Sequence, residues 1–225
     1  MKEIQRLIEI SQSYGRDSRY VIAGGGNTSY KNGEKLWVKA SGHALATIGE
    51  EGFAVLDRAK LNLISTKTYS DDPAAREEEV KNDLAAACLT KDRRPSVETS
   101  LHNALAASYV VHLHPTLVNA LMCSRDAEAK TAELFGEEAL YIPYIDPGYI
   151  LFKEVERRIG EYKARTGGRE PEVILLQNHG IFVGAETPER VRAVYDRVLE
   201  TIGKAVENPL PEGADAEDDP AERER

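Results

Sequence analysis

The dipeptide Asn32-Gly33 most constrains what this chain can fold into, because it favours a tight turn between two antiparallel strands. Residues 27–30 lead into it and residues 36–39 return from it, and both segments suit a β-strand. A β-hairpin is therefore predicted here, and the sheet that contains it must include antiparallel pairing. The hairpin excludes an all-parallel, doubly wound nucleotide-binding fold.

Helical and strand patterns are mixed along the rest of the chain. Helices are predicted at residues 2–14, 58–64, 74–89, 96–107, 117–122, 131–134, 152–165 and 188–206. Further strands are predicted at residues 54–56, 109–114, 141–145, 173–176 and 181–183. We expect a layered α/β domain around a largely antiparallel sheet.

The chain length and charge distribution indicate a single folded domain followed by a tail. The 225 residues fit one core, which we assign to residues 1–207. Residues 208–225 form an acidic tail that we expect to be disordered. The formal net charge of −9 argues against general affinity for nucleic acid.

Nothing in the sequence indicates export or a membrane. The first segment, Lys2 to Tyr14, alternates apolar and charged residues and lacks the apolar core of a signal peptide. No stretch approaches the ~18 apolar residues of a membrane span. Cys88 and Cys123 lack CxxC spacing and suit reduced core residues. We therefore expect a cytoplasmic protein with no membrane partner.

The segment His112-Leu113-His114, inside an apolar run, is the strongest chemical signal. Side chains alternate along a strand, so the two histidines project to the same side. Neutral imidazoles placed in this way make two of the ligands that zinc takes. The alternative is a pair of histidines on a solvated edge strand, but the flanking Val111 and Leu113 favour a buried strand.

His179 is the candidate for a third ligand. It lies between Asn178 and Gly180, just past an apolar strand, where a turn can bring its ring back toward the sheet. A lone histidine in a turn also occurs as hydrogen-bonded scaffolding. Three histidines with an open position are typical of a catalytic zinc site.

Glu98 is the candidate proton-transfer group. It is predicted in the first turn of a helix that Ser96 caps, one connection before the twin-histidine strand. A carboxylate near a metal can serve in general acid–base catalysis. The alternative is a glutamate that complements the helix dipole. His102 shares the same helix face, and we interpret it as a packing or supporting residue.

The run from Gly24 to Ser29, GGGNTS, could approach an anion through its backbone and its polar side chains. Ser41-Gly42 ends the second hairpin strand and could face the same anion. Neither segment is a nucleotide-binding motif. Ordinary turn chemistry is the alternative for both.

Five motifs together resemble the class II aldolase/adducin family. They occur in the family's order: GGGNTS, SG at residues 41–42, PSVE at 95–98, HLHP at 112–115 and NHG at 178–180. The chain is most similar to the aldolase half of bifunctional rhamnulose-1-phosphate aldolase/alcohol dehydrogenase proteins. The resemblance implies a three-layer α/β/α fold around an antiparallel sheet, in a homotetramer with active sites between subunits.

The resemblance also implies roles for individual residues. His112, His114 and His179 would bind zinc, with another divalent metal as the alternative, and Glu98 would be the acid/base. Phosphate would be bound by Asn27, Ser41, Gly42 and Ser96. Family members often have a second serine where this chain has Val97, so one hydroxyl donor is missing. Tyr144 matches a family tyrosine that reaches the active site from a neighbouring subunit and protonates the aldehyde oxygen.

The implied activity is cleavage of a ketose 1-phosphate, of the rhamnulose or fuculose type, to dihydroxyacetone phosphate and an aldehyde. Epimerases, dehydratases and decarboxylases that act on sugar phosphates use the same fold and metal site. A non-catalytic, adducin-like assembly module would have a broken histidine triad, whereas the triad is intact here. A metal-binding regulatory domain would bind zinc without cleaving carbon–carbon bonds.

Overall fold

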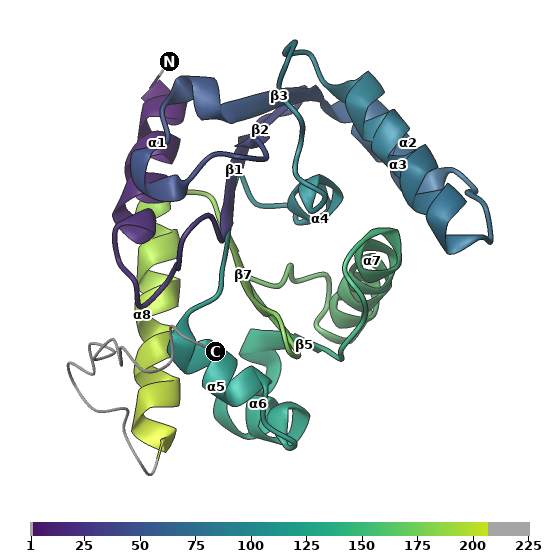
Figure 1. Cartoon of the computed structure of the whole chain (residues 1–225). Helices are drawn as coiled ribbons and strands as arrows, with labels where there is room; N and C mark the ends of the chain where they lie inside the picture. The colour runs from purple at the N-terminus through teal and green to yellow at the C-terminus, as the bar shows by residue number, and fades with distance from the viewer. Residues whose placement is uncertain (1, 207–225) are drawn as a thin grey trace, which may run out of the picture.

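The computed structural model describes residues 2–206, so the predicted acidic tail lies outside the described residues. Among them, seven strands form one sheet in the order β3-β2-β1-β4-β7-β6-β5. The strands are β1 (Asn27–Lys31), β2 (Lys35–Lys39), β3 (Phe53–Asp57), β4 (Tyr109–Leu113), β5 (Ala139–Ile142), β6 (Val173–Leu176) and β7 (Gly180–Ala185). The sheet is flanked by helices on both faces, which makes three layers (Figure 1).

The predicted hairpin is present as β1 and β2, which pair in antiparallel fashion with Ser29 opposite Val38. The side chain of Asn32 holds the turn, since its Oδ1 accepts the backbone N–H groups of Glu34 at 2.9 Å and Lys35 at 2.8 Å. An asparagine side chain that bonds to the backbone ahead of it is a common device for closing turns. The NG signal thus identified the hairpin correctly.

The sheet is mixed, which corrects the expectation of a largely antiparallel one. Strands β5 and β6 run parallel, with Leu140 opposite Ile174. The helix α7 (Tyr149–Arg165) lies between them in the sequence. A connection of that length can return the chain to the starting edge of the sheet, which a tight hairpin cannot do.

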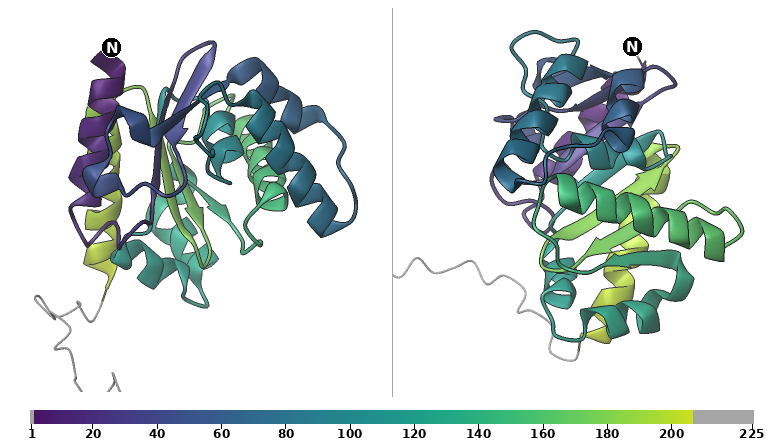
Figure 2. Two further views of the ribbon diagram at one scale, coloured as in Figure 1. Left: turned by 45° about the horizontal axis from the view of Figure 1, so that its top comes forward. Right: turned by 90° about the vertical axis from the view of Figure 1, so that its right-hand side faces the viewer.

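One face of the sheet is covered by α1 (Lys2–Gly15) and α8 (Pro188–Ala205), which lie side by side in Figures 1 and 2. The helices α5 (Thr116–Met122) and α6 (Ala127–Phe135) extend this layer. Leu7 and Ile10 of α1 pack here with Val194 and Val198 of α8, all almost completely buried. This apolar layer carries much of the hydrophobic stabilisation of the domain.

The other face carries α2 (Arg58–Thr66), α3 (Pro73–Ala87), α4 (Thr99–Ala104) and α7, on the opposite side of the sheet in Figure 2. Leu61, Leu84, Leu101 and Val155 form a second core with the strands. Asp57 and Asp72 cap α2 and α3 by accepting backbone N–H groups in their first turns. Among residues 2–206, no helix has the length and apolar character that crossing a membrane requires.

Candidate metal centre

His112 lies on β4, the central strand of the sheet, near the end of that strand. It lies between Asn27 of β1 and Phe182 of β7, and its side chain is completely buried. Its Nδ1 is 3.0 Å from the carbonyl oxygen of Ile181, so Nδ1–H donates to that oxygen. A neutral ring that carries its proton on Nδ1 leaves Nε2 free to act as a ligand.

The structure brings the three predicted ligands together. The ring centroids of His112 and His114 are 4.7 Å apart, and the centroid of His179 is 4.9 Å from the first and 5.3 Å from the second. One ligand nitrogen from each ring lies within 4.8 Å of the other two. These side chains could therefore hold one metal ion. Strand alternation predicted the pair, and the turn after β6 supplies the third ring.

The turn that carries His179 depends on two neighbouring residues. The backbone N–H of His179 donates to the carbonyl of Leu176 at 3.2 Å, and Asn178 adopts φ +56°. Asparagine tolerates this left-handed conformation better than most residues. Gly180 follows, and a Cβ there would lie 2.5 Å from the Leu113 carbonyl oxygen and 2.6 Å from the His114 ring. The histidines can converge because position 180 has no side chain.

Glu98 joins the cluster from α4, but not from the first helical turn as the sequence predicts. It occupies the N-cap position and makes no capping bond with its side chain. The segment before it forms a turn, because Thr99 N–H donates to the Ser96 carbonyl at 3.1 Å. The Glu98 carboxylate instead lies 3.1 Å from His112 Nε2 and 3.3 Å from His179 Nε2.

Burial and charge set the protonation states in this cluster. Burial raises the pKa of Glu98, but the attraction of His112 and His179 lowers it more, so that pKa lies well below its usual range. Burial, reinforced by the neighbouring His112 and His179, lowers the pKa of His114 to about 4. The site therefore combines an ionised carboxylate with a neutral His114 imidazole near neutral pH.

The donor set fits a divalent cation. His112 Nε2 faces His114 Nε2 at 3.0 Å and the Glu98 carboxylate at 3.1 Å. Because the proton of a neutral His112 is on Nδ1, its Nε2 lone pair points toward other lone pairs. This arrangement is repulsive unless a proton or a cation lies among them. Three imidazoles and a carboxylate suit a transition metal such as zinc.

The predicted phosphate-binding residues lie around the same end of the sheet. The backbone N–H of Ser41 donates to the Arg94 carbonyl at 2.9 Å, which joins the loop after β2 to the segment that contains Ser96. Gly42 adopts φ +88° in this loop. Asn27 is buried opposite His112, and its Oδ1 has no hydrogen-bond partner among the described residues. Their binding of phosphate stays a prediction.

Tyr144 lies on the loop after β5, exposed at 54% of its surface. Its backbone N–H donates to the Gln177 side chain at 3.1 Å, which fixes the loop beside the turn that carries His179. Its hydroxyl donates to Asp146 at 2.9 Å. The side chain thus points away from the protein core, and its predicted role in a neighbouring subunit's site stays a prediction.

Lys39 was missed by the sequence analysis. It ends β2 next to the Ser41-Gly42 loop and is only 7% exposed. Burial lowers the pKa of Lys39, whereas the charge of Glu98 opposes this change. The available signal was a lysine directly after the apolar Trp37-Val38, because lysine is rarely buried unless it is paired.

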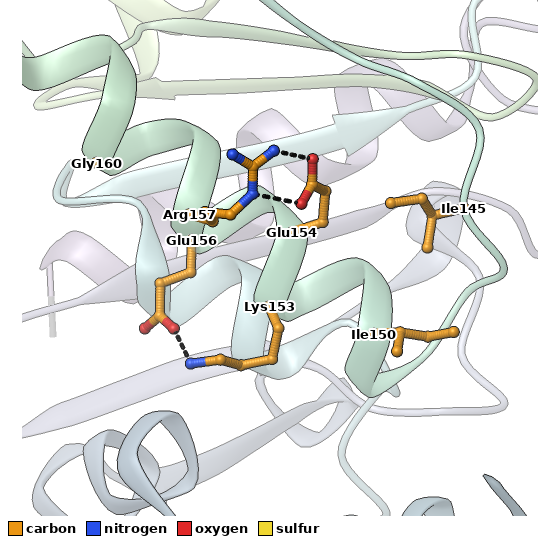
Figure 3. Close-up of a pocket in the computed structure, with 7 residues that line it drawn as sticks. All are labelled: Ile145, Ile150, Lys153, Glu154, Glu156, Arg157 and Gly160. Carbon is orange, nitrogen blue, oxygen red and sulfur yellow. Dashed lines mark hydrogen bonds and ion pairs between the residues drawn. The ribbon is translucent and has the colours of Figure 1, made fainter.

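A hollow of about 720 Å³ lies elsewhere, on the outer surface of α7 (Figure 3). Its lining includes none of the predicted site residues. The charged side chains around it pair with one another, Lys153 with Glu156 and Arg157 with Glu154. These groups are already satisfied, so the hollow offers a ligand little beyond Ile145 and Ile150.

Residues 5–202 match the family model of the class II aldolase and adducin N-terminal domain. The fold and the site together define a layered α/β protein with a candidate metal centre at one end of its sheet. The match over most of the chain is more specific. The chain belongs to the class II aldolase and adducin family.

Individual relatives agree with this membership. The chain is 28% identical over 215 residues to the uncharacterized oxidoreductase YuxG of Bacillus subtilis, covering 91% of this chain but 29% of that protein. It is 24% identical over 168 residues to the L-fuculose phosphate aldolase of Methanocaldococcus jannaschii, covering 73% of this chain and 75% of that one. The N-terminal class II aldolase domain of a Thermoplasma acidophilum protein superposes with a TM-score of 0.73 at 27% identity, covering 90% and 92% of the two chains.

Proposed function

We propose that this protein is a zinc-dependent aldolase that cleaves a ketose 1-phosphate, of the rhamnulose or fuculose type, to dihydroxyacetone phosphate and an aldehyde. The observation that carries the proposal is the convergence of His112, His114 and His179 with the Glu98 carboxylate. The relative named L-fuculose phosphate aldolase supports this substrate class. The fold alone supports only the family, because related folds serve many functions.

The three histidines would hold the metal, and a bound divalent cation would polarise the substrate carbonyl as a Lewis acid. His112 is pre-oriented for this task by its bond to Ile181, and His114 is kept neutral by burial. Neutral imidazole is the form that binds metal. The nitrogen ligands support zinc over a harder cation.

Glu98 would move the proton that accompanies carbon–carbon bond formation and cleavage. In the condensation direction, the ionised carboxylate takes a proton from the carbon beside the carbonyl of dihydroxyacetone phosphate. In the cleavage direction the step is reversed, so the Glu98 carboxyl group must start in its protonated form and gives its proton to that same carbon. Its low pKa in the metal-free protein suits the base form. Tyr144 of a neighbouring subunit would protonate the aldehyde oxygen in the condensation direction.

The phosphate group would lie against Asn27, Ser41, Gly42 and Ser96. Support comes from the contact between the loop after β2 and the segment before α4, which puts Ser41 near Ser96. Lys39 would add a positive charge at this edge, although the chain as a whole is acidic. Val97 is 74% exposed and gives no hydroxyl where relatives often have serine.

The test is a panel of ketose 1-phosphates that includes rhamnulose and fuculose 1-phosphate. Dihydroxyacetone phosphate is detected by coupled reduction with NADH, and metal content is measured by mass spectrometry. We expect aldehyde release that chelation abolishes and Zn²⁺ restores. A zinc-loaded protein that epimerises, dehydrates or decarboxylates its substrate without releasing an aldehyde would contradict the aldolase assignment.

The predicted homotetramer is tested separately by size-exclusion chromatography with light scattering. If the active site needs Tyr144 from another subunit, a Tyr144→Phe protein should lose activity while keeping its zinc. A monomeric protein with full activity would contradict both the tetramer and this role for Tyr144.

A further inference from the structure

The helix that carries Glu98 is too short to fix its own position. α4 has only six residues, Thr99–Ala104, and Glu98 is its N-cap. Helices of this length are not stable alone and depend on tertiary contacts. The position of the Glu98 carboxylate therefore depends on what holds α4 against the sheet.

His102 makes that attachment with both its side chain and its backbone. Its Nδ1 is 2.8 Å from the hydroxyl of Ser29 on β1. Its carbonyl accepts from the buried Lys31 ammonium group, also on β1, at 2.8 Å. Its own N–H donates to the Glu98 carbonyl at 3.1 Å. One residue thus connects the hairpin strand β1 to the residue that carries the carboxylate.

The ring of His102 also reaches the metal ligands through Phe182. The His102 and Phe182 rings meet edge to face with centroids 5.4 Å apart. Phe182 in turn stacks on His112, at 4.0 Å between centroids and an interplanar angle of 17°. The same imidazole therefore borders both parts of the site, the carboxylate on α4 and the ligand on β4.

A histidine is a costly choice for such a place. His102 is completely buried, and its Nε2 has no hydrogen-bond partner among the described residues. Burying an unpaired polar atom destabilises the folded state, and an apolar side chain would avoid this cost. The directional bond from Nδ1 to Ser29 is what an apolar side chain could not supply.

We propose that His102 is a positioning residue for Glu98, and that its bond to Ser29 fixes α4 so that the carboxylate stays against His112 and His179. Only the kinetic readout of this proposal rests on the proposed function. The second readout, the absorption spectrum of the Co²⁺-loaded protein, requires only the metal centre. Glu98 borders two of the three ligand nitrogens, so the spectrum should respond to a displaced carboxylate.

The experiment compares four variants. Ser29→Ala and His102→Leu remove the bond from either side. His102→Asn keeps a polar atom where Nδ1 lies and should restore the bond to Ser29. The matched control is Ser100→Ala on the same helix, because its buried hydroxyl has no hydrogen-bond partner among the described residues. Circular dichroism and thermal unfolding establish that each variant is folded.

We expect Ser29→Ala and His102→Leu to bind one Co²⁺ with a spectrum shifted toward that of Glu98→Gln. Their kcat should fall by roughly 10- to 100-fold with little change in KM, as for other residues that orient a metal site. His102→Asn should recover most of the spectrum and of kcat, and Ser100→Ala should match the unaltered protein.

Unchanged spectra and kcat in Ser29→Ala and His102→Leu would overturn the proposal. An equal loss in Ser100→Ala or no recovery in His102→Asn would also overturn it, because general packing would then explain the effect. If the unaltered protein binds Co²⁺ but cleaves no ketose phosphate, the proposed function fails while the spectra still decide this question. If it binds no Co²⁺, both fail.

Discussion

The two faces of the central sheet differ in chemistry although the same strands build both. On β1, Tyr30 packs with the apolar core beneath α1, and the Thr28 hydroxyl lies 2.7 Å from Ser11 of that helix. The alternate residues Ser29 and Lys31 contact His102 of α4 on the other side. Strand alternation lets one element serve stability on one face and the candidate site on the other.

Strand β4 repeats this division. Tyr109, Val111 and Leu113 belong to the core shared with α1 and α8. His112 lies on the opposite face, toward α4 and the Glu98 carboxylate. Burying such polar groups lowers the stability of the fold unless they are paired. Substitutions on the two faces should therefore affect different properties of the protein. Substitutions of the polar residues that face α4 should remove function from a folded protein, whereas substitutions in the apolar core beneath α1 and α8 should lower the stability of a functional one.

The largest effect is expected for His114→Ala. Loss of one of three imidazole ligands should lower metal affinity by more than about 100-fold, because loss of a group that only hydrogen-bonds to a ligand already lowers it by up to that factor. Metal content and cleavage activity should therefore disappear together, while circular dichroism stays unchanged. A full zinc complement in this variant would contradict the proposed ligand set.

Glu98→Gln should separate metal binding from chemistry. The amide cannot accept the proton, so turnover should fall by roughly 10²- to 10⁴-fold. The three histidines remain, so zinc content measured by mass spectrometry should match that of the unaltered protein. An unchanged turnover number would remove Glu98 from the mechanism.

The opposite outcome is expected for Leu7→Ala on the other face. Leu7 is fully buried in α1 within the apolar core. Its truncation should lower the free energy of unfolding by roughly 2–5 kcal/mol, measured by urea denaturation. At temperatures where the variant is folded, kcat and zinc content should not change. A specific loss of kcat would show that the two faces are not separable.

The smallest effect, taken per pH unit, is the pH dependence of stability that Lys31 introduces. Burial, with the nearby Arg58 charge, lowers the pKa of Lys31 from 10.5 to about 7, and Glu186 opposes this shift. Between these two values the unfolded chain binds a proton that the folded protein has released. The contribution of Lys31 to stability should therefore rise by about 1.4 kcal/mol per pH unit in that window, and stay level below it.

Lys31→Met removes this contribution. The difference in unfolding free energy between the two proteins should change with that slope, because the other titrating groups cancel in the comparison. Urea denaturation of both proteins across the window measures it. Two curves that stay parallel would show that the buried ammonium group keeps its ordinary pKa.

Local sequence patterns predicted much of this fold. The Asn32-Gly33 turn identified the hairpin, and alternation along residues 109–114 placed His112 and His114 on one side. The position of His179 followed from an apolar strand that ends in a polar turn. Each of these inferences uses residues a few positions apart, where chain geometry leaves few choices.

The remaining features depend on residues far apart in the sequence. The parallel pairing of β5 with β6 requires knowing where α7 packs. The N-cap position of Glu98 depends on the turn at Ser96, although the sequence favours a longer helix there. The bond from Ser29 to His102 spans 73 positions, and no local pattern indicates it.

The alternation along β1 has a consequence for how related chains can change in length. Deleting one residue inside residues 27–31 would exchange the two faces of the strand, so that Tyr30 would meet α4 and Lys31 would enter the apolar core. The same holds for residues 109–113. Insertions and deletions during evolution should therefore gather in the connecting loops and spare these two segments.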